Sequence, residues 1–78
     1  MNQVKQEILE NVFHIMVSKP VEQGKVVKIG QHQVFKDASQ DYPYVVEKFE
    51  YTENGQDMFS VYDGYGNLLD AVNVALHL

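Results

Sequence analysis

A chain of 78 residues has room for one core, so we expect residues 1–78 to fold as a single domain. It contains no cysteine, which excludes disulfides and thiolate metal sites, and its net charge of −5 without any arginine argues against direct nucleic-acid binding. No apolar run reaches the roughly 20 residues that cross a bilayer, and residues 1–7 lack the pattern of a signal peptide, so we expect no membrane contact and a cytoplasmic location.

The first predicted element is an amphipathic helix over residues 3–18. Its apolar residues recur at the spacing of one helical face, and they are Val4, Ile8, Leu9, Val12, Phe13 and Met16. Asn2 is the expected N-cap. Pro20 is expected to end the helix, because a proline disfavours helical geometry at the residue before it, here Lys19.

Two short strands are predicted next, over about 25–29 and 32–36, from runs of β-branched residues. Gly30 and Gln31 between them form either a tight turn or a bulge within one long strand. The turn, and therefore a hairpin, is the favoured interpretation. A polar loop over 37–43 follows.

The clearest local signal is Asn54-Gly55, which separates predicted strands over about 44–52 and 57–62. These two residues suit the two positive-φ positions of a type I′ turn. Neither face of the resulting hairpin is cleanly polar, which predicts partial cover on both sides. The cross-strand pairs expected from this turn are Tyr51 with Met58 and Phe49 with Ser60.

A second turn is predicted over 62–67, where Asp63 at the first position and Gly66 near the end suit a four-residue loop, and a fifth strand over about 67–75 follows it. Residues 70–78 alternate like a strand but also repeat at helical spacing, so both structures are considered. The strand is favoured by its β-branched content. The predicted fold class is α+β: one N-terminal helix packed on an antiparallel β-meander of four to five strands.

No set of residues in the sequence specifies a chemistry. His14, His32 and His77 share no metal-ligand spacing, and the loop near Asp63 lacks the bidentate glutamate of a calcium site. No nucleophile motif is legible. We therefore expect no metal, no cofactor and no enzymatic activity, and a small-molecule-binding or catalytic domain is the third-ranked alternative.

The C-terminal half carries all of the net negative charge, since residues 44–78 hold one lysine and six carboxylates. Tyrosines stand beside these carboxylates, and tyrosine is enriched among the residues that anchor protein interfaces. Tyr65 is expected at the tip of a turn, where a core role is least favoured. The predicted partner-binding residues are Tyr44, Glu50, Glu53, Asp57, Asp63 and Tyr65.

These features predict a small acidic protein-binding module without enzymatic activity, of the kind found among accessory and inhibitor proteins of bacteria and phages. Its acidic, tyrosine-bearing hairpins would engage a protein partner, including one with a basic groove. The alternative is a self-associating structural subunit, a homodimer, because exposed strand edges favour dimerisation.

Overall fold

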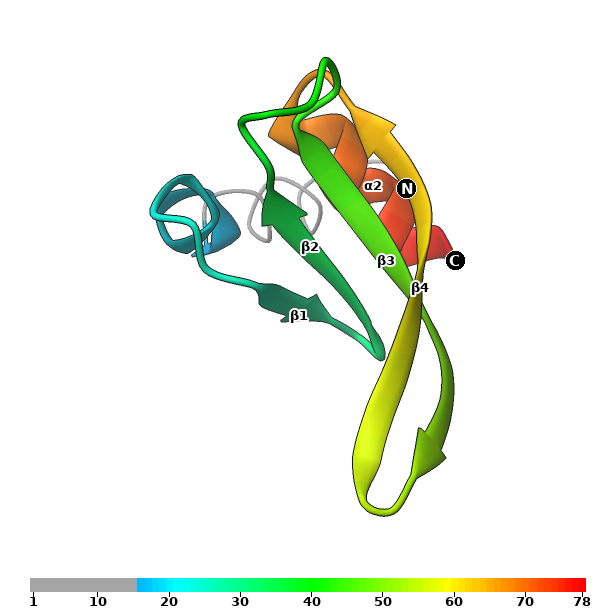
Figure 1. The fold of residues 1–78 in the computed structure, drawn as a ribbon. Helices are drawn as coiled ribbons and strands as arrows, with labels where there is room; N and C mark the ends of the chain where they lie inside the picture. The colour runs from blue at the N-terminus through cyan, green and yellow to red at the C-terminus, as the bar shows by residue number, and fades with distance from the viewer. Residues whose placement is uncertain (1–15) are drawn as a thin grey trace.

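Residues 16–78, the part of the chain that the computed structural model describes, form an antiparallel sheet flanked by helices (Figure 1). Residues 16–22 are helical. They are followed by β1 (Val27–Ile29), β2 (His32–Lys36), β3 (Tyr44–Glu53), β4 (Gln56–Tyr65) and α2 (Leu68–His77). The strands lie in the order β1-β2-β3-β4, each antiparallel to the next. The predicted α+β class with an antiparallel meander is confirmed.

The helical segment ends at Glu22, two residues after Pro20, so the prediction that Pro20 ends a helix is wrong. The N–H of Lys25 bonds to the carbonyl of Pro20 and the N–H of Gly24 to that of Val21, both at 3.0 Å. Gly24 has φ +83°. These are the bonds of a Schellman motif, in which a left-handed residue reverses the chain. Proline lacks an N–H donor, but its fixed φ of about −65° is compatible with helical geometry, and its carbonyl accepts the bond from Lys25, so the helical segment continues past it. Residues 3–15 of the predicted helix lie outside the described part of the chain.

The sequence left two alternatives for residues 25–36, a hairpin or one bulged strand, and the structure shows the hairpin. β1 and β2 are antiparallel, with Ile29 opposite His32 and Val27 opposite Val34. Gly30 at the first turn position has φ +64°, as a two-residue type II′ turn requires.

The β3–β4 hairpin has the predicted turn but only part of the predicted register. Asn54 and Gly55 have φ of +54° and +77°, and Tyr51 pairs with Met58. Phe49, however, pairs with Phe59 instead of Ser60, because Glu50 is an extra residue in β3. Such a bulge shifts the pairing by one residue and exchanges the two faces beyond it. A second irregularity, at Tyr62 in β4, restores the original offset.

The predictions of a turn over 62–67 and of a fifth strand over 67–75 are both wrong. β4 continues to Tyr65, and α2 then begins with Asn67 as its N-cap. The Asn67 side chain accepts a hydrogen bond from the Asp70 N–H at 2.9 Å, which satisfies one of the orphan donors of the first helical turn. The residues of α2 that become buried are Leu68, Ala71, Val72 and Ala75. Only a helix places residues at this spacing on one face.

The core lies between the helices and one face of the sheet, which we call the inner face. It comprises Val17, Val21, Ile29, Val34, Val46, Leu68, Ala71, Val72 and Ala75. Segment 16–22 and α2 therefore pack on the same side of the sheet (Figure 1). Phe35 and Val45 alternate with Val34 and Val46 along β2 and β3, so they point to the outer face.

Candidate functional site

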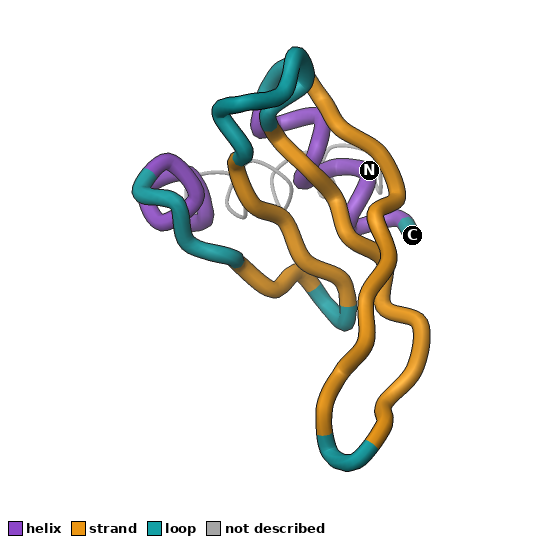
Figure 2. The backbone as a smooth tube through the Cα atoms, in the orientation of Figure 1, coloured by secondary structure: helices purple, strands orange, loops and turns teal. Residues whose placement is uncertain are grey.

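The far half of the β3–β4 hairpin extends beyond the rest of the sheet (Figures 1 and 2). β3 pairs with β2 only from Tyr44 to Glu47, whereas its pairing with β4 continues to Glu53 opposite Gln56. Residues 48–62 therefore form a two-stranded projection, which we call the hairpin arm. A two-stranded ribbon has no core of its own, so its side chains remain available for contacts with another molecule.

The hairpin arm brings together three of the six predicted partner-binding residues, Glu50, Glu53 and Asp57. Glu50 is the bulged residue of β3, and its carboxylate accepts a hydrogen bond from the Ser60 hydroxyl. With Lys48 as the one cation, the arm carries a net charge of −2. Its surface is therefore acidic, as the sequence predicts for this half of the chain.

Lys28 of β1 connects the hairpin arm to the body of the sheet. Its Nζ lies 2.8 Å from Asp57 Oδ2 and 5.6 Å from the centroid of the Phe59 ring. Phe59 also packs edge-to-face on Phe49, with the ring centroids 6.0 Å apart. An exposed ion pair contributes little stability by itself, but these contacts together connect β4 of the arm to β1.

Large apolar and aromatic side chains of the hairpin arm are open to solvent. Val61 is 66% exposed, Tyr51 is 53% exposed and Tyr62 is 52% exposed. Tyr51 lies directly opposite Met58 on the arm, so the two share a face. The expected cover on both sides of this hairpin is thus missing from the described residues at the arm. Uncovered apolar area next to charged groups is a mark of interaction surfaces.

The other three predicted residues, Tyr44, Asp63 and Tyr65, lie at the opposite end of the same two strands. Tyr44 is directly opposite Tyr65, and both rings are half-buried against the core. The placement of Tyr65 at a turn tip is therefore wrong. Tyr44 and Glu53 are nine positions apart along β3, which corresponds to about 30 Å. The six residues do not form one site.

Tyr44 belongs to a small polar cluster that joins segment 16–22 to the sheet. Glu22 accepts hydrogen bonds from Lys36 Nζ, at 2.7 Å, and from the Tyr44 hydroxyl. Lys36 Nζ also lies 5.4 Å from the centroid of the Tyr44 ring. The hydrogen bond from Lys36, followed by that from Tyr44, lowers the pKa of Glu22. The same bonds to Glu22 raise the pKa of Lys36 and that of Tyr44.

This cluster predicts a stability plateau with a loss at each end of the pH range. The lowered pKa of Glu22 stabilises the fold above its ordinary value of 4.5, and this is lost as pH falls through the lowered pKa. The raised pKa of Tyr44 stabilises the fold below its ordinary value of 10.0, and this is lost as pH rises through the raised pKa. Urea denaturation at a series of pH values measures the free energy of unfolding along both the acid limb and the alkaline limb of this profile.

Glu22→Gln should flatten the acid limb of this profile. Glu53→Gln removes the same charge at the hairpin turn, away from the cluster, and should leave the limb as it is. An acid limb unchanged by Glu22→Gln would contradict the role of the cluster.

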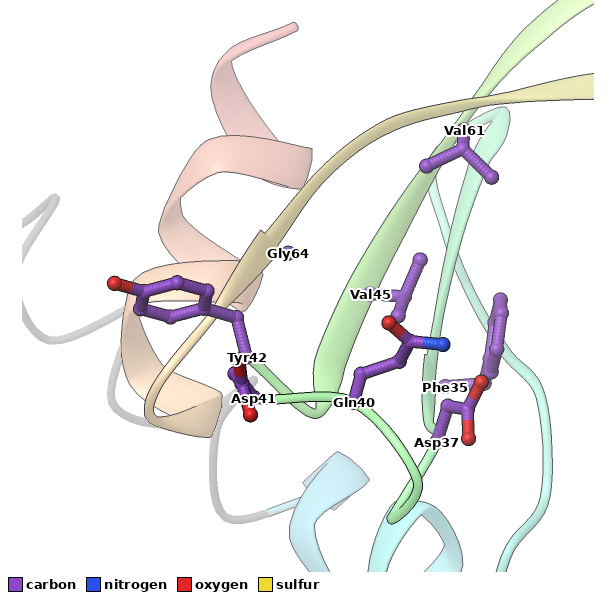
Figure 3. A pocket seen from close by; sticks show the side chains of 8 residues that line it. All are labelled: Phe35, Asp37, Gln40, Asp41, Tyr42, Val45, Val61 and Gly64. Carbon is purple, nitrogen blue, oxygen red and sulfur yellow. The ribbon is translucent and has the colours of Figure 1, made fainter.

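A groove opens on the outer face of the sheet, beneath the loop 37–43 (Figure 3). We call it the loop groove; its volume is about 450 Å³. The sheet contributes the apolar side chains of Phe35, Val45 and Val61 together with Gly64. The loop contributes Asp37, Gln40, Asp41 and Tyr42. Asp37 and Gln40 extend from the loop toward Phe35 and Val45, whereas the Tyr42 ring points the other way.

The loop that borders the groove is held by local hydrogen bonds. The Asp37 N–H bonds to the carbonyl of Pro43 at 2.7 Å and closes the loop. Asp37 Oδ1 accepts from the N–H and the hydroxyl of Ser39, at 3.1 and 2.6 Å. The hydroxyl bond and then the backbone bond lower the pKa of Asp37, so its carboxylate stays charged at neutral pH. The loop side of the groove therefore carries a negatively charged carboxylate, that of Asp37, which its hydrogen bonds hold in one orientation.

The loop groove was missed from the sequence. The only local sequence feature that indicates an ordered loop there is Asp37, which precedes Ser39 by two residues and so favours an Asx turn. Nothing local indicates that this loop lies over Val45 and Val61. That contact depends on the order of the strands.

Neither a metal cluster nor a membrane span is found among the described residues. Across residues 16–78, no group of three or more His, Asp and Glu side chains could hold a metal ion. No helix in the same range is long and apolar enough to cross a membrane.

The chain matches no protein-family model, no curated protein and no solved structure. The function below is therefore argued from the geometry of the hairpin arm and the loop groove.

Proposed function

We propose that this chain is a protein-binding module without enzymatic activity, a small accessory or inhibitor protein that engages its partner through the hairpin arm. The observation that carries the proposal is the arm itself: a ribbon that projects from the sheet with Val61, Tyr51 and Tyr62 exposed. Tyrosine offers an interface a large contact area at a low cost in side-chain entropy. We assign Tyr51 and Tyr62 as the anchors.

The charge of the arm indicates the partner. Its net charge of −2 lies within a chain of net charge −5, so its field attracts a basic surface. Complementary charges of this kind mainly accelerate association and select the partner, while desolvated aromatic anchors slow dissociation. A partner with a basic groove meets both requirements.

The proposal is tested by capture from the native cells followed by binding kinetics. The tagged chain is used to retain proteins from lysate, and the retained protein is then measured against purified variants. Glu50→Lys combined with Glu53→Lys should slow association about tenfold at low salt, and the difference should shrink as salt approaches 1 M, where the Debye length is about 3 Å. Tyr51→Ala should raise the dissociation rate with little effect on association.

Asp63→Lys provides the matched control. It makes the same charge change as Glu53→Lys on the same two strands, but at the end near α2. Equal effects of the two single changes, or no salt dependence, would refute binding through the arm. Capture of the same proteins by the parent chain and by the variant with both Glu50→Lys and Glu53→Lys would also refute it.

A second candidate function, self-association, is favoured by the position of β4. β4 is an edge strand of ten residues in the described sheet, and an edge presents backbone groups that a second strand can pair with. Light scattering at micromolar concentration separates the candidates. A dimer that Val61→Lys converts to monomer would favour self-association, and a monomer would favour a different partner protein.

A further inference from the structure

We propose that the loop groove receives the side chain of a lysine or arginine from the protein bound at the hairpin arm. This inference rests on the proposed function, because it names the chemistry that the partner presents. It adds a second contact on the outer face of the sheet, where the sequence predicted none.

The size and lining of the groove fit a long basic side chain. Phe35, Val45 and Val61 form an apolar surface, which suits the methylene stem of lysine or arginine. A volume of about 450 Å³ lies within the usual range for sites that hold a small ligand.

The charges around the groove select a cation. Asp37 and Asp41 are both on the loop wall, and no lysine occurs among the described residues that line the groove. Asp37 is already oriented by its two bonds from Ser39, so little ordering is needed when a cation arrives. An anionic group would meet the Asp37 carboxylate, which extends toward Phe35 and Val45, and a purely apolar side chain would leave that carboxylate without a counter-ion.

The groove is continuous with the hairpin arm. Val61 belongs to the arm and also lines the groove, and it is 66% exposed. It pairs with Glu47 of β3 on the outer face. A partner that covers the outer side of the arm therefore reaches the groove without any rearrangement of the described strands.

Direct binding to the groove can be measured before the partner is known. The probes are N-acetyl-lysine methylamide and N-acetyl-arginine methylamide, titrated at millimolar concentration into the ¹⁵N-labelled full chain. N-acetyl-norleucine methylamide supplies the same stem without charge. The cations should shift the amides of Gln40, Asp41 and Gly64, and the norleucine probe should bind more weakly.

Asp37→Asn and Asp41→Asn should each weaken binding of the cations about threefold or more, the strength of an exposed ion pair. Asparagine keeps the Oδ1 acceptor that orders the loop at position 37, and Asp41→Asn leaves the Ser39 bonds intact. Asp70→Asn, which removes one charge in the first turn of α2, should leave binding of the probes unchanged. Equal binding of lysine and norleucine probes, or no effect of either asparagine variant, would overturn the inference.

The two proposals fail in different ways. If Glu50→Lys with Glu53→Lys slows association with a captured protein but the probes do not bind, arm binding stands and the inference about the groove is wrong. If the probes bind and no captured protein depends on the arm, the cation is not supplied by an arm-bound partner, which also overturns the inference. With a captured partner in hand, Asp37→Asn should raise its dissociation rate.

Discussion

Replacing Gly64 with alanine should lower the free energy of unfolding by about 1–3 kcal/mol, the usual cost of overpacking. A Cβ built at Gly64 would lie 2.8 Å from the backbone carbonyl oxygen of Tyr42 and 3.2 Å from its Cβ. Backbone cannot rotate away as a flexible side chain can, so the loop 37–43 must move. Urea denaturation measures the loss, and amide shifts across 37–43 report the displacement.

Gly66→Ala is the matched control for this change. No atom lies within 4 Å of a Cβ built at Gly66, two residues farther along the chain. The alanine should be neutral or slightly stabilising there, because it restricts the unfolded chain. If the two variants unfold alike, the close approach of the loop to β4 is wrong, and the shape of the loop groove is wrong with it.

Replacing His32 with leucine should also lower the free energy of unfolding by about 1 kcal/mol, the low end of the cost of leaving a donor without an acceptor, because the Phe49 N–H is part-buried. His32 is buried, and its Nδ1 accepts a hydrogen bond from the Phe49 N–H at 3.0 Å. Phe49 lies just beyond Glu47, where the pairing of β3 with β2 ends. The imidazole thus satisfies a backbone donor at the point where the hairpin arm leaves the sheet.

His32→Asn separates the hydrogen bond from the packing of the ring. Its Oδ1 takes nearly the position of the histidine Nδ1, so the asparagine should retain the bond and lose only ring contacts. Hydrogen exchange at the Phe49 amide is the specific measurement: it should accelerate in His32→Leu and stay slower in His32→Asn. Equal exchange in both variants would mean that this bond does not protect the amide.

The local sequence alone determines the two hairpin turns, at Gly30-Gln31 and at Asn54-Gly55, and the strands on either side of them. Asn54-Gly55 predicts the type I′ turn correctly, because positive φ at two successive residues is sterically easy for very few residue pairs. Gly30 likewise predicts the first hairpin. The concentration of carboxylates after residue 44 predicts that the hairpin is acidic, since charge does not depend on how the chain packs.

The C-terminal segment shows what the local sequence leaves open. Residues 68–77 fit both a strand and a helix, so local preference could not decide between them. The inner face of the sheet decides, because Leu68, Ala71, Val72 and Ala75 can cover it together only from a helix. Asn67 is the N-cap of this helix. Asparagine is favoured both at N-caps and in turns, so this residue could not distinguish the two structures.

The candidate site divides in the same way. Glu50, Glu53 and Asp57 were correctly placed on one hairpin, because strand pairing near a recognised turn follows from the turn. The exposed Val61 and the loop groove were decided by the tertiary structure. Their positions depend on two bulges, on the early end of the β2–β3 pairing and on a loop that folds over β4, and each of these depends on contacts between residues far apart in the sequence.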